Sequence, residues 1–180
     1  MRRGVVAAAL VALIFVVGCS QKHGPSALPP IVLRADGLRI ATFGDDRTTV
    51  ERILTARVGA PPRPESAAAV GGCNGGTTRI VTYADSLTAY FSGEKFTGYD
   101  YFHDPKARFR TAEGATIGTT LDRLRSIYGS RIQVNSAPSP LGGSDFTIDG
   151  PPPRGIAGHA TGDAGDNQTV SLAAGQRCHQ

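Results

Sequence analysis

Two short segments with helical periodicity, residues 43–59 and 117–129, place the tightest limit on what this chain can fold into. Each begins with an apolar residue and a glycine, continues with residues that can cap a helix, and has an apolar residue six positions after that glycine. Each also ends at a glycine, which is common just beyond a helix C-terminus because it readily adopts left-handed backbone angles. We therefore expect two short amphipathic helices, one in each half of the chain.

Both segments have candidate N-caps and one apolar face. Asp45 or Asp46 can cap the first helix, and Thr119 or Thr120 the second. Each side-chain oxygen can accept a hydrogen bond from a free N–H of the first turn. The residues expected to face the core are Val50, Ile53, Leu54 and Val58 in the first helix and Leu121, Leu124, Ile127 and Tyr128 in the second.

Strand-like runs follow each helix. After the first come TTRIVTYAD, SLTAYFS and KFTGYDYF, the last two joined by a hairpin at Ser92-Gly93-Glu94. After the second come SDFTIDG, GIAGHATG and QTVSLAAGQRC. The order of helix and then strands occurs twice. We therefore expect an α+β protein in which two tandem helix-then-antiparallel-sheet units, residues 31–104 and 105–180, form one compact domain.

Residues 1–18 have the three-part pattern of a secretory signal peptide. A pair of arginines precedes an apolar run from Val5 to Val17, and the small residue Gly18 follows. A helix that spans a bilayer needs about 20 apolar residues, so this run is too short for a permanent transmembrane span. An uncleaved short anchor or a buried helix is the alternative.

The signal segment closes with Val16-Val17-Gly18-Cys19. These four residues resemble the lipobox of bacterial lipoproteins, in which aliphatic and small residues precede a cysteine. The resemblance implies cleavage between Gly18 and Cys19, a diacylglycerol on the Cys19 thiol, and acyl chains such as palmitate. Two or more acyl chains hold a protein stably at a membrane. We expect an extracytoplasmic protein anchored to the cell membrane by lipid on Cys19, with residues 19–30 as a polar tether.

The charge balance argues against nucleic acid as a partner. Removal of residues 1–18 takes Lys and Arg from 19 to 17 against 15 Asp and Glu, so the net charge is near +2. No basic run lies beside the anchor. Nucleic-acid binding generally requires a clustered basic patch. We expect contact with the membrane through the lipid rather than through charge.

Two cysteines, Cys73 and Cys178, remain beyond Cys19. An exported chain enters an oxidising compartment, where an even pair indicates a disulfide. A disulfide that closes a loop of about 100 residues stabilises a fold by up to roughly 4–5 kcal/mol in the chain-entropy model. A reactive or metal-binding pair is the alternative, although neither cysteine belongs to a CxxC motif.

A second resemblance covers most of residues 36–178. It rests on the repeated FG…V…L…G pattern, the central cysteine, and the segments SLTAYFSGEKFTGYDYF, RTAEGATIGTTLDRLRSIYG and SLAAGQRC. In these features the chain resembles a group of secreted proteins and lipoproteins from high-GC Gram-positive bacteria. Their layout is similar to the tandem α+β repeat of the β-lactamase inhibitor protein and, in each repeat, to the small outer-membrane assembly lipoproteins. The resemblance implies a disulfide between Cys73 and Cys178 and a binding rather than a catalytic role.

No motif in the chain indicates an enzyme, a cofactor or a metal site. It has no G-x-S-x-G nucleophile elbow, no phosphate loop and no metal-ligand spacing. We expect a non-catalytic binding or envelope-interaction module whose partner is an envelope protein or a cell-wall component. A small cell-wall hydrolase or a protein inhibitor of an envelope enzyme is the alternative.

Two geometries would separate these functions. Strand alternation predicts that Tyr99 and Tyr101 share an outer face while the neighbouring phenylalanines point inward. A continuous exposed sheet face with both tyrosines would favour partner binding. A deep pocket that gathers His103 or His159 with a serine and a carboxylate would favour a hydrolase.

Overall fold

The computed structural model of the chain describes residues 31–59, 64–66, 76–104, 106, 108–135, 139, 142–162 and 167–177. Strands dominate this part, which has twelve strands in two sheets and only two α-helices. No helix among these residues is long and apolar enough to cross a bilayer.

The larger sheet has eight strands, and every neighbouring pair is antiparallel. In spatial order the strands are β4 (Pro64–Ser66), β5 (Arg79–Tyr83), β6 (Leu87–Ser92), β7 (Lys95–Phe102), β12 (Gln168–Gly175), β11 (Ile156–Thr161), β10 (Ser144–Ile148) and β9 (Ile132–Val134). The first four and the last four are each consecutive in the chain. They meet where β7 pairs with β12.

The smaller sheet has four short strands in the order β3 (Ala41–Thr42), β2 (Gly37–Leu38), β1 (Ile31–Arg34) and β8 (Phe109–Thr111). β1, β2 and β3 pair antiparallel, whereas β1 and β8 pair in parallel. This sheet therefore joins the start of the described chain to a strand from its middle.

The predicted fold class is wrong. The chain is mostly β rather than an α+β protein built from two helix-then-sheet units. Strand pairing between β7 and β12 merges the strand runs into one sheet, and residues 31–42 join β8 in a second sheet. The helix signals are strong but local, and they cover only 12 and eight residues.

The two helices themselves are confirmed. Asp46 caps α1 (Arg47–Val58) by accepting a hydrogen bond from the Thr49 backbone N–H. Thr120 caps α2 (Leu121–Tyr128) in the same way, and a single 3₁₀ turn (Gly129–Arg131) follows. The buried helical residues are Val50, Leu54, Leu121, Leu124 and Tyr128.

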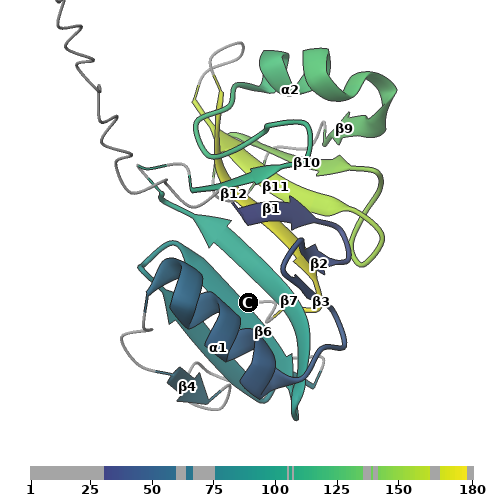
Figure 1. Ribbon diagram of the computed structural model, residues 1–180. Helices are drawn as coiled ribbons and strands as arrows, with labels where there is room; N and C mark the ends of the chain where they lie inside the picture. The colour runs from purple at the N-terminus through teal and green to yellow at the C-terminus, as the bar shows by residue number, and fades with distance from the viewer. Residues whose placement is uncertain are drawn as a thin grey trace, which may run out of the picture.

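The core lies between one face of the large sheet and the elements packed on it. α1 contacts β5 and β7, β2 contacts β7, and α2 contacts β9 (Figure 1). The largest fully buried side chains on and beside this face are Tyr83, Phe91, Phe96, Tyr99, Tyr101 and Phe109. The opposite face of the large sheet carries the alternate residues of each strand, and the candidate site lies there.

Candidate ligand-binding site on the large sheet

The tyrosines expected on an exposed face, Tyr99 and Tyr101, lie in the core instead. Both are fully buried. The Tyr99 hydroxyl donates a hydrogen bond to the backbone carbonyl of Arg34 at 3.0 Å, and burial raises the pKa of Tyr101 to about 12. These two residues cannot form a partner-binding face, so that prediction is wrong.

A β-bulge explains the error. Tyr90 of β6 lies opposite Gly98 of β7. The next residue, Phe91, lies opposite Phe96, so β7 carries one extra residue at this point. An extra residue reverses the alternation of the strand beyond it. Phe96 and Tyr99 consequently face the same, covered side of the sheet.

Four predicted site residues lie outside the described part of the chain: Gly18, Cys19, Cys73 and Cys178. Two described residues near the last two cysteines in the sequence are close in space. A Cβ atom at Gly76 would lie 3.9 Å from the side-chain nitrogen of Gln176. These residues are three positions after one cysteine and two before the other. The disulfide stays a prediction, and this proximity supports it.

His103 and His159 have different environments. His103 is exposed and follows β7 with a left-handed φ of 41°. His159 is buried in β11 and lines a pocket. Of the two, His159 belongs to the candidate site.

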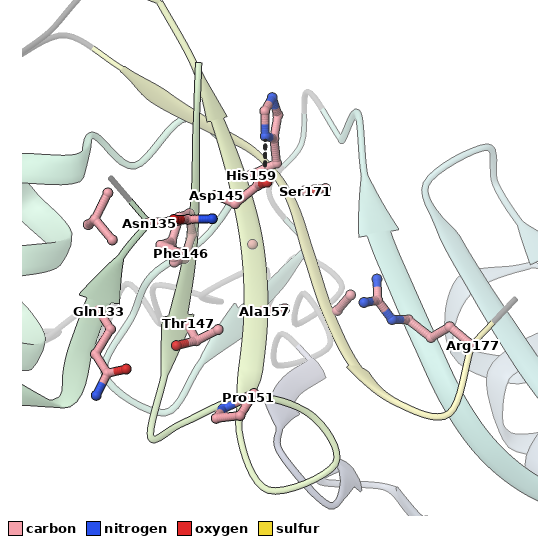
Figure 2. Close-up of a pocket in the computed structure, with 13 residues that line it drawn as sticks. Gln133, Asn135, Asp145, Phe146, Thr147, Pro151, Ala157, His159, Ser171 and Arg177 are labelled. Atoms are coloured by element: carbon pink, nitrogen blue, oxygen red, sulfur yellow. Dashed lines mark hydrogen bonds and ion pairs between the residues drawn. The ribbon is translucent and has the colours of Figure 1, made fainter. Parts of the chain in front are cut away.

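The pocket, of about 610 Å³, lies on the face of the large sheet that points away from the core (Figure 2). Its lining comes from β9, β10, β11 and β12 and from residues that follow them. The polar side chains used in the argument below are Gln133, Asp145, Thr147, His159, Ser171 and Arg177. A pocket of this size falls within the usual range for small-molecule sites.

Small residues on the two central strands create the hollow. Ala157 of β11 pairs with Ala173 of β12, and both line the pocket with Gly158. Gly158 is also small on the core side, where a Cβ atom would lie only 2.2 Å from the ring of its cross-strand partner, Phe146. β11 and β12 therefore form a low floor, and longer polar side chains of the neighbouring strands rise beside it.

Asp145 and His159 form a hydrogen-bonded pair across β10 and β11. They are direct cross-strand partners, and His159 Nδ1 lies 2.6 Å from Asp145 Oδ1. A carboxylate can only accept, so His159 carries a proton on Nδ1. His159 Nε2 is buried and has no hydrogen-bond partner among the described residues.

Arg177 occupies the other end of the pocket. Its guanidinium donates to Asp100 at 2.9 Å, and the Tyr90 hydroxyl donates to the other oxygen of the same carboxylate at 2.6 Å. The pKa of Tyr90 lies well above its ordinary value, mainly because the hydroxyl is buried and also because the Asp100 carboxylate is beside it. Arg177 Nε is buried and, within the described chain, unpartnered. Two of the residues that line the pocket thus each have one buried polar atom without a hydrogen-bond partner in the described chain.

Ser171 completes the residue types of a hydrolytic triad but not its connections. It lies directly opposite His159 in β12, so Asp145, His159 and Ser171 stand on three adjacent strands. A nucleophilic serine must hydrogen-bond to the imidazole nitrogen that takes its proton. His159 Nε2 makes no such bond. The sequence-based criterion for an enzyme is therefore met in composition but not in geometry.

A second hollow, of about 400 Å³, lies where the small sheet meets β10 and β11. Arg131 forms ion pairs there with Glu113 (3.0 Å) and Asp149 (2.6 Å) and lies 5.4 Å from the centre of the Tyr128 ring. These charges satisfy one another, so this cluster stabilises the junction and offers a ligand little.

No protein-family model, curated protein or solved structure is significantly similar to this chain. Within the described residues, no group of three His, Cys, Asp or Glu side chains is placed to hold a metal ion. The geometry of the pocket is therefore the basis for a functional proposal.

Sequence patterns single out His159 but not Asp145, Ser171 or Arg177 as its neighbours in a site. Strand pairing brings these residues together, and local periodicity does not specify which strands pair. One available signal is the small residues of GIAGHATG. Glycine within a strand often marks a close approach of another group.

Proposed function

We propose that this protein is a non-catalytic binding module of the cell envelope, held by lipid on Cys19, that takes its ligand in the pocket over β9–β12. The observation that carries the proposal is the pocket itself, of about 610 Å³, which lies on the face of the large sheet that points away from the core and is lined by Asp145, His159 and Arg177. A concave pocket of this size with a few convergent polar side chains is the usual form of a ligand site.

Blocking the pocket tests the binding role. Ala157 is part of the floor and Ala56 is exposed on α1, so Ala157→Arg and Ala56→Arg add the same side chain inside and outside the pocket. Crosslinking of the full chain in intact envelopes should recover the same bound component with wild type and Ala56→Arg. We expect Ala157→Arg to lose it. Equal recovery with all three proteins, each shown to be folded, would exclude the pocket as the site.

The lipid anchor is supported by the VVGC pattern and is tested separately. In Cys19→Ala the thiol that accepts the lipid is gone, so we expect the protein to leave the membrane fraction or to accumulate as the precursor. Labelling cells with a radioactive fatty acid, followed by detergent partitioning, measures this. Equal lipid incorporation in wild type and variant would contradict the anchor.

A hydrolase is the second candidate, and the placement of Ser171 opposite His159 favours it. A fluorophosphonate probe, which labels activated serines, distinguishes the two functions. We expect no labelling, because His159 Nε2 makes no bond that would activate Ser171. Labelling that disappears in Ser171→Ala would establish a hydrolase. A recovered partner that is an envelope enzyme, slowed by this protein, would instead identify a protein inhibitor.

A further inference from the structure

Three side chains around the floor of the pocket have hydrogen-bonding atoms that no described residue uses. The hydroxyls of Thr147 and Ser171 make no hydrogen bond to the described chain, and both residues are only half-buried. Asp145 uses one carboxylate oxygen for His159 and keeps the other, and its side chain is 48% exposed. All three side chains are accessible and line the pocket, so a ligand can meet them directly.

Strand pairing arranges these groups around Ala157. Thr147 is the cross-strand partner of Ala157 on β10, and Asp145 lies two residues before Thr147 on the same face. Ser171 lies on β12, opposite His159, which is itself the partner of Asp145. Asp145 and Ser171 are thus two strand spacings apart, roughly 10 Å. The floor between the free groups is small and apolar, and the buried His159 forms a wall beside it.

This spacing suits one six-membered sugar ring. Hydrogen bonds between oxygen atoms are about 2.7–2.8 Å long, so two of them leave roughly 4–5 Å between the ligand atoms that make them. Hydroxyls on opposite edges of a pyranose ring are separated by about that distance. The C–H groups on the face of the ring would then lie against the methyl group of Ala157.

The charges of the pocket do not favour an anionic ligand. Arg177 pairs with Asp100 at 2.9 Å, and His159 pairs with Asp145 at 2.6 Å. In either charge state of His159, no cation among the described residues that line the pocket lacks an acidic partner. An anion would therefore lose hydration without gaining an ion pair. Two of the three free groups are neutral hydroxyls, which both donate and accept, so a neutral ligand rich in hydroxyls matches them best.

A peptide main chain fits this floor less well than a sugar. Peptides that bind to sheets commonly add a strand at an exposed edge, where backbone groups are unpaired. β11 and β12 lie inside the eight-stranded sheet, and each is paired on both sides. The floor of the pocket therefore offers side-chain atoms to a ligand rather than backbone groups.

Gln133 extends the set of free groups beyond β10. It is the cross-strand partner of Thr147 on β9, it is exposed, and its side chain makes no hydrogen bond to the described chain (Figure 2). Its amide has two donors and an acceptor, so it can pair with another amide group. A second sugar ring, next to the one over Ala157, would place an acetamido group well for this contact.

We propose that the pocket binds a neutral sugar chain that carries acetamido groups and crosses the strands from β12 toward β9. One ring lies over Ala157. The hydroxyls of this ring hydrogen-bond to Asp145, Thr147 and Ser171. The acetamido group of the next ring pairs with Gln133. This assignment rests on the proposed binding function and names the ligand class for the same pocket.

The test compares two trisaccharides with the same linkage that differ in one substituent on each ring. Tri-N-acetylchitotriose carries an acetamido group where cellotriose carries a hydroxyl. Each is titrated into the full-length protein, in a detergent without a sugar headgroup, and binding is followed by calorimetry. A neutral hydrogen bond changes affinity by about two- to tenfold, so we expect tri-N-acetylchitotriose to bind more tightly by about that factor. In Gln133→Ala the two sugars should bind alike.

Two further variants test the position of the first ring. Ser171→Ala and Thr147→Val each remove a hydroxyl that makes no hydrogen bond within the described chain, so the fold should be unaffected. Each should weaken the binding of tri-N-acetylchitotriose by about two- to tenfold. Ser126→Ala is the matched control, because Ser126 is exposed on α2, and this variant should bind like wild type.

The outcomes separate this inference from the proposed function. Equal affinity of wild type for the two sugars overturns the acetamido contact, and this comparison requires no variant to fold. The sugar assignment is overturned if neither trisaccharide binds, or if Ser171→Ala and Thr147→Val both bind like wild type. Binding of N-acetyl-trialanine amide, without binding of either sugar, overturns the ligand class. In each of these cases the binding function stands if Ala157→Arg still loses the crosslinked component, and it fails if Ala157→Arg loses nothing.

Discussion

The two halves of the large sheet, β4–β7 and β9–β12, are built from different side chains on the same framework. The core-facing side of the first half carries large aromatic residues, among them Phe96 and Tyr99. On the open face, the central strands of the second half carry small residues, among them Ala157 and Ala173. Large side chains fill space and fix one packing, whereas small ones leave a hollow on the open face. The candidate site therefore lies in the half that is less filled.

The link between the halves also differs from either of them. Asp104 follows β7 and is buried, and it accepts hydrogen bonds from the backbone N–H groups of Lys106 and Arg108. The Arg108 guanidinium lies 3.2 Å from the same carboxylate. A charged network thus stabilises the turn between the first half and β8, whereas apolar packing stabilises the first half itself.

The largest expected loss of stability is in the first half of the sheet, β4–β7. The Phe96 ring packs against Phe43 (5.2 Å between ring centres) and Phe91 (5.8 Å). Removing a fully buried ring leaves a cavity, so Phe96→Ala should lower the free energy of unfolding by about 3–5 kcal/mol. Phe146→Ala, in the second half, should cost less, because among the described residues Phe146 packs against no other aromatic ring. Urea denaturation measures both, and a greater loss for Phe146→Ala would break the comparison between the halves.

Loss of the predicted disulfide should come next. The end of β12 lies against the first half, where the Gln176 N–H donates to the Thr97 carbonyl at 2.8 Å. A bond between Cys73 and Cys178 would fix this contact. Replacing both cysteines with serine should lower the free energy of unfolding by about 2–5 kcal/mol, and each single replacement should cost as much as the pair. Mass spectrometry without reduction is the direct check, and two free thiols on folded, exported protein would contradict the prediction.

A smaller loss is expected from filling the second half on its core side. In Gly158→Ala the new Cβ would meet the Phe146 ring at 2.2 Å. Overpacking of this kind costs about 1–3 kcal/mol. Ala157→Ser, one residue away on the pocket side, should change stability much less because Ala157 has open space above it. Thermal unfolding of both variants checks this, and equal stability of Gly158→Ala and wild type would show that the ring can move away.

The last predicted effect, similar in size to that of Gly158→Ala, concerns acid. Burial alone would raise the pKa of Asp104, but hydrogen bonds from Arg108 and Lys106 outweigh it and hold this pKa below its ordinary value of 3.8. A lowered pKa contributes stability that is fully present above about pH 4 and is lost as the pH falls through the folded-state pKa. Asp104→Asn should remove part of this acid sensitivity and lower stability at pH 7 by about 1–3 kcal/mol. Asp149→Asn is the control, because a hydrogen bond from Arg131 also lowers the pKa of Asp149, but this side chain is exposed. If both variants changed stability equally, the role of burial at Asp104 would be contradicted.

By itself, the sequence determined the features that depend on neighbouring residues. The caps at Asp46 and Thr120 fix where the helices begin, and Gly93, with a φ of 58°, makes the two-residue turn between β6 and β7. A cap or a tight turn is formed by atoms a few positions apart, so its signal survives in the linear pattern.

Only the tertiary structure decided the arrangement of these local features. The bulge that turns Tyr99 inward depends on which residue of β6 lies opposite each residue of β7, and the merging of the two strand runs depends on the pairing of β7 with β12. The pocket depends on two further pairings, which bring Asp145, His159 and Ser171 to adjacent positions. Strand register is set by contacts between residues far apart in the chain, and a shift of one residue moves a side chain to the opposite face. For this reason the alternating pattern of β7 was compatible with Tyr99 and Tyr101 on the surface or in the core, and packing placed them in the core.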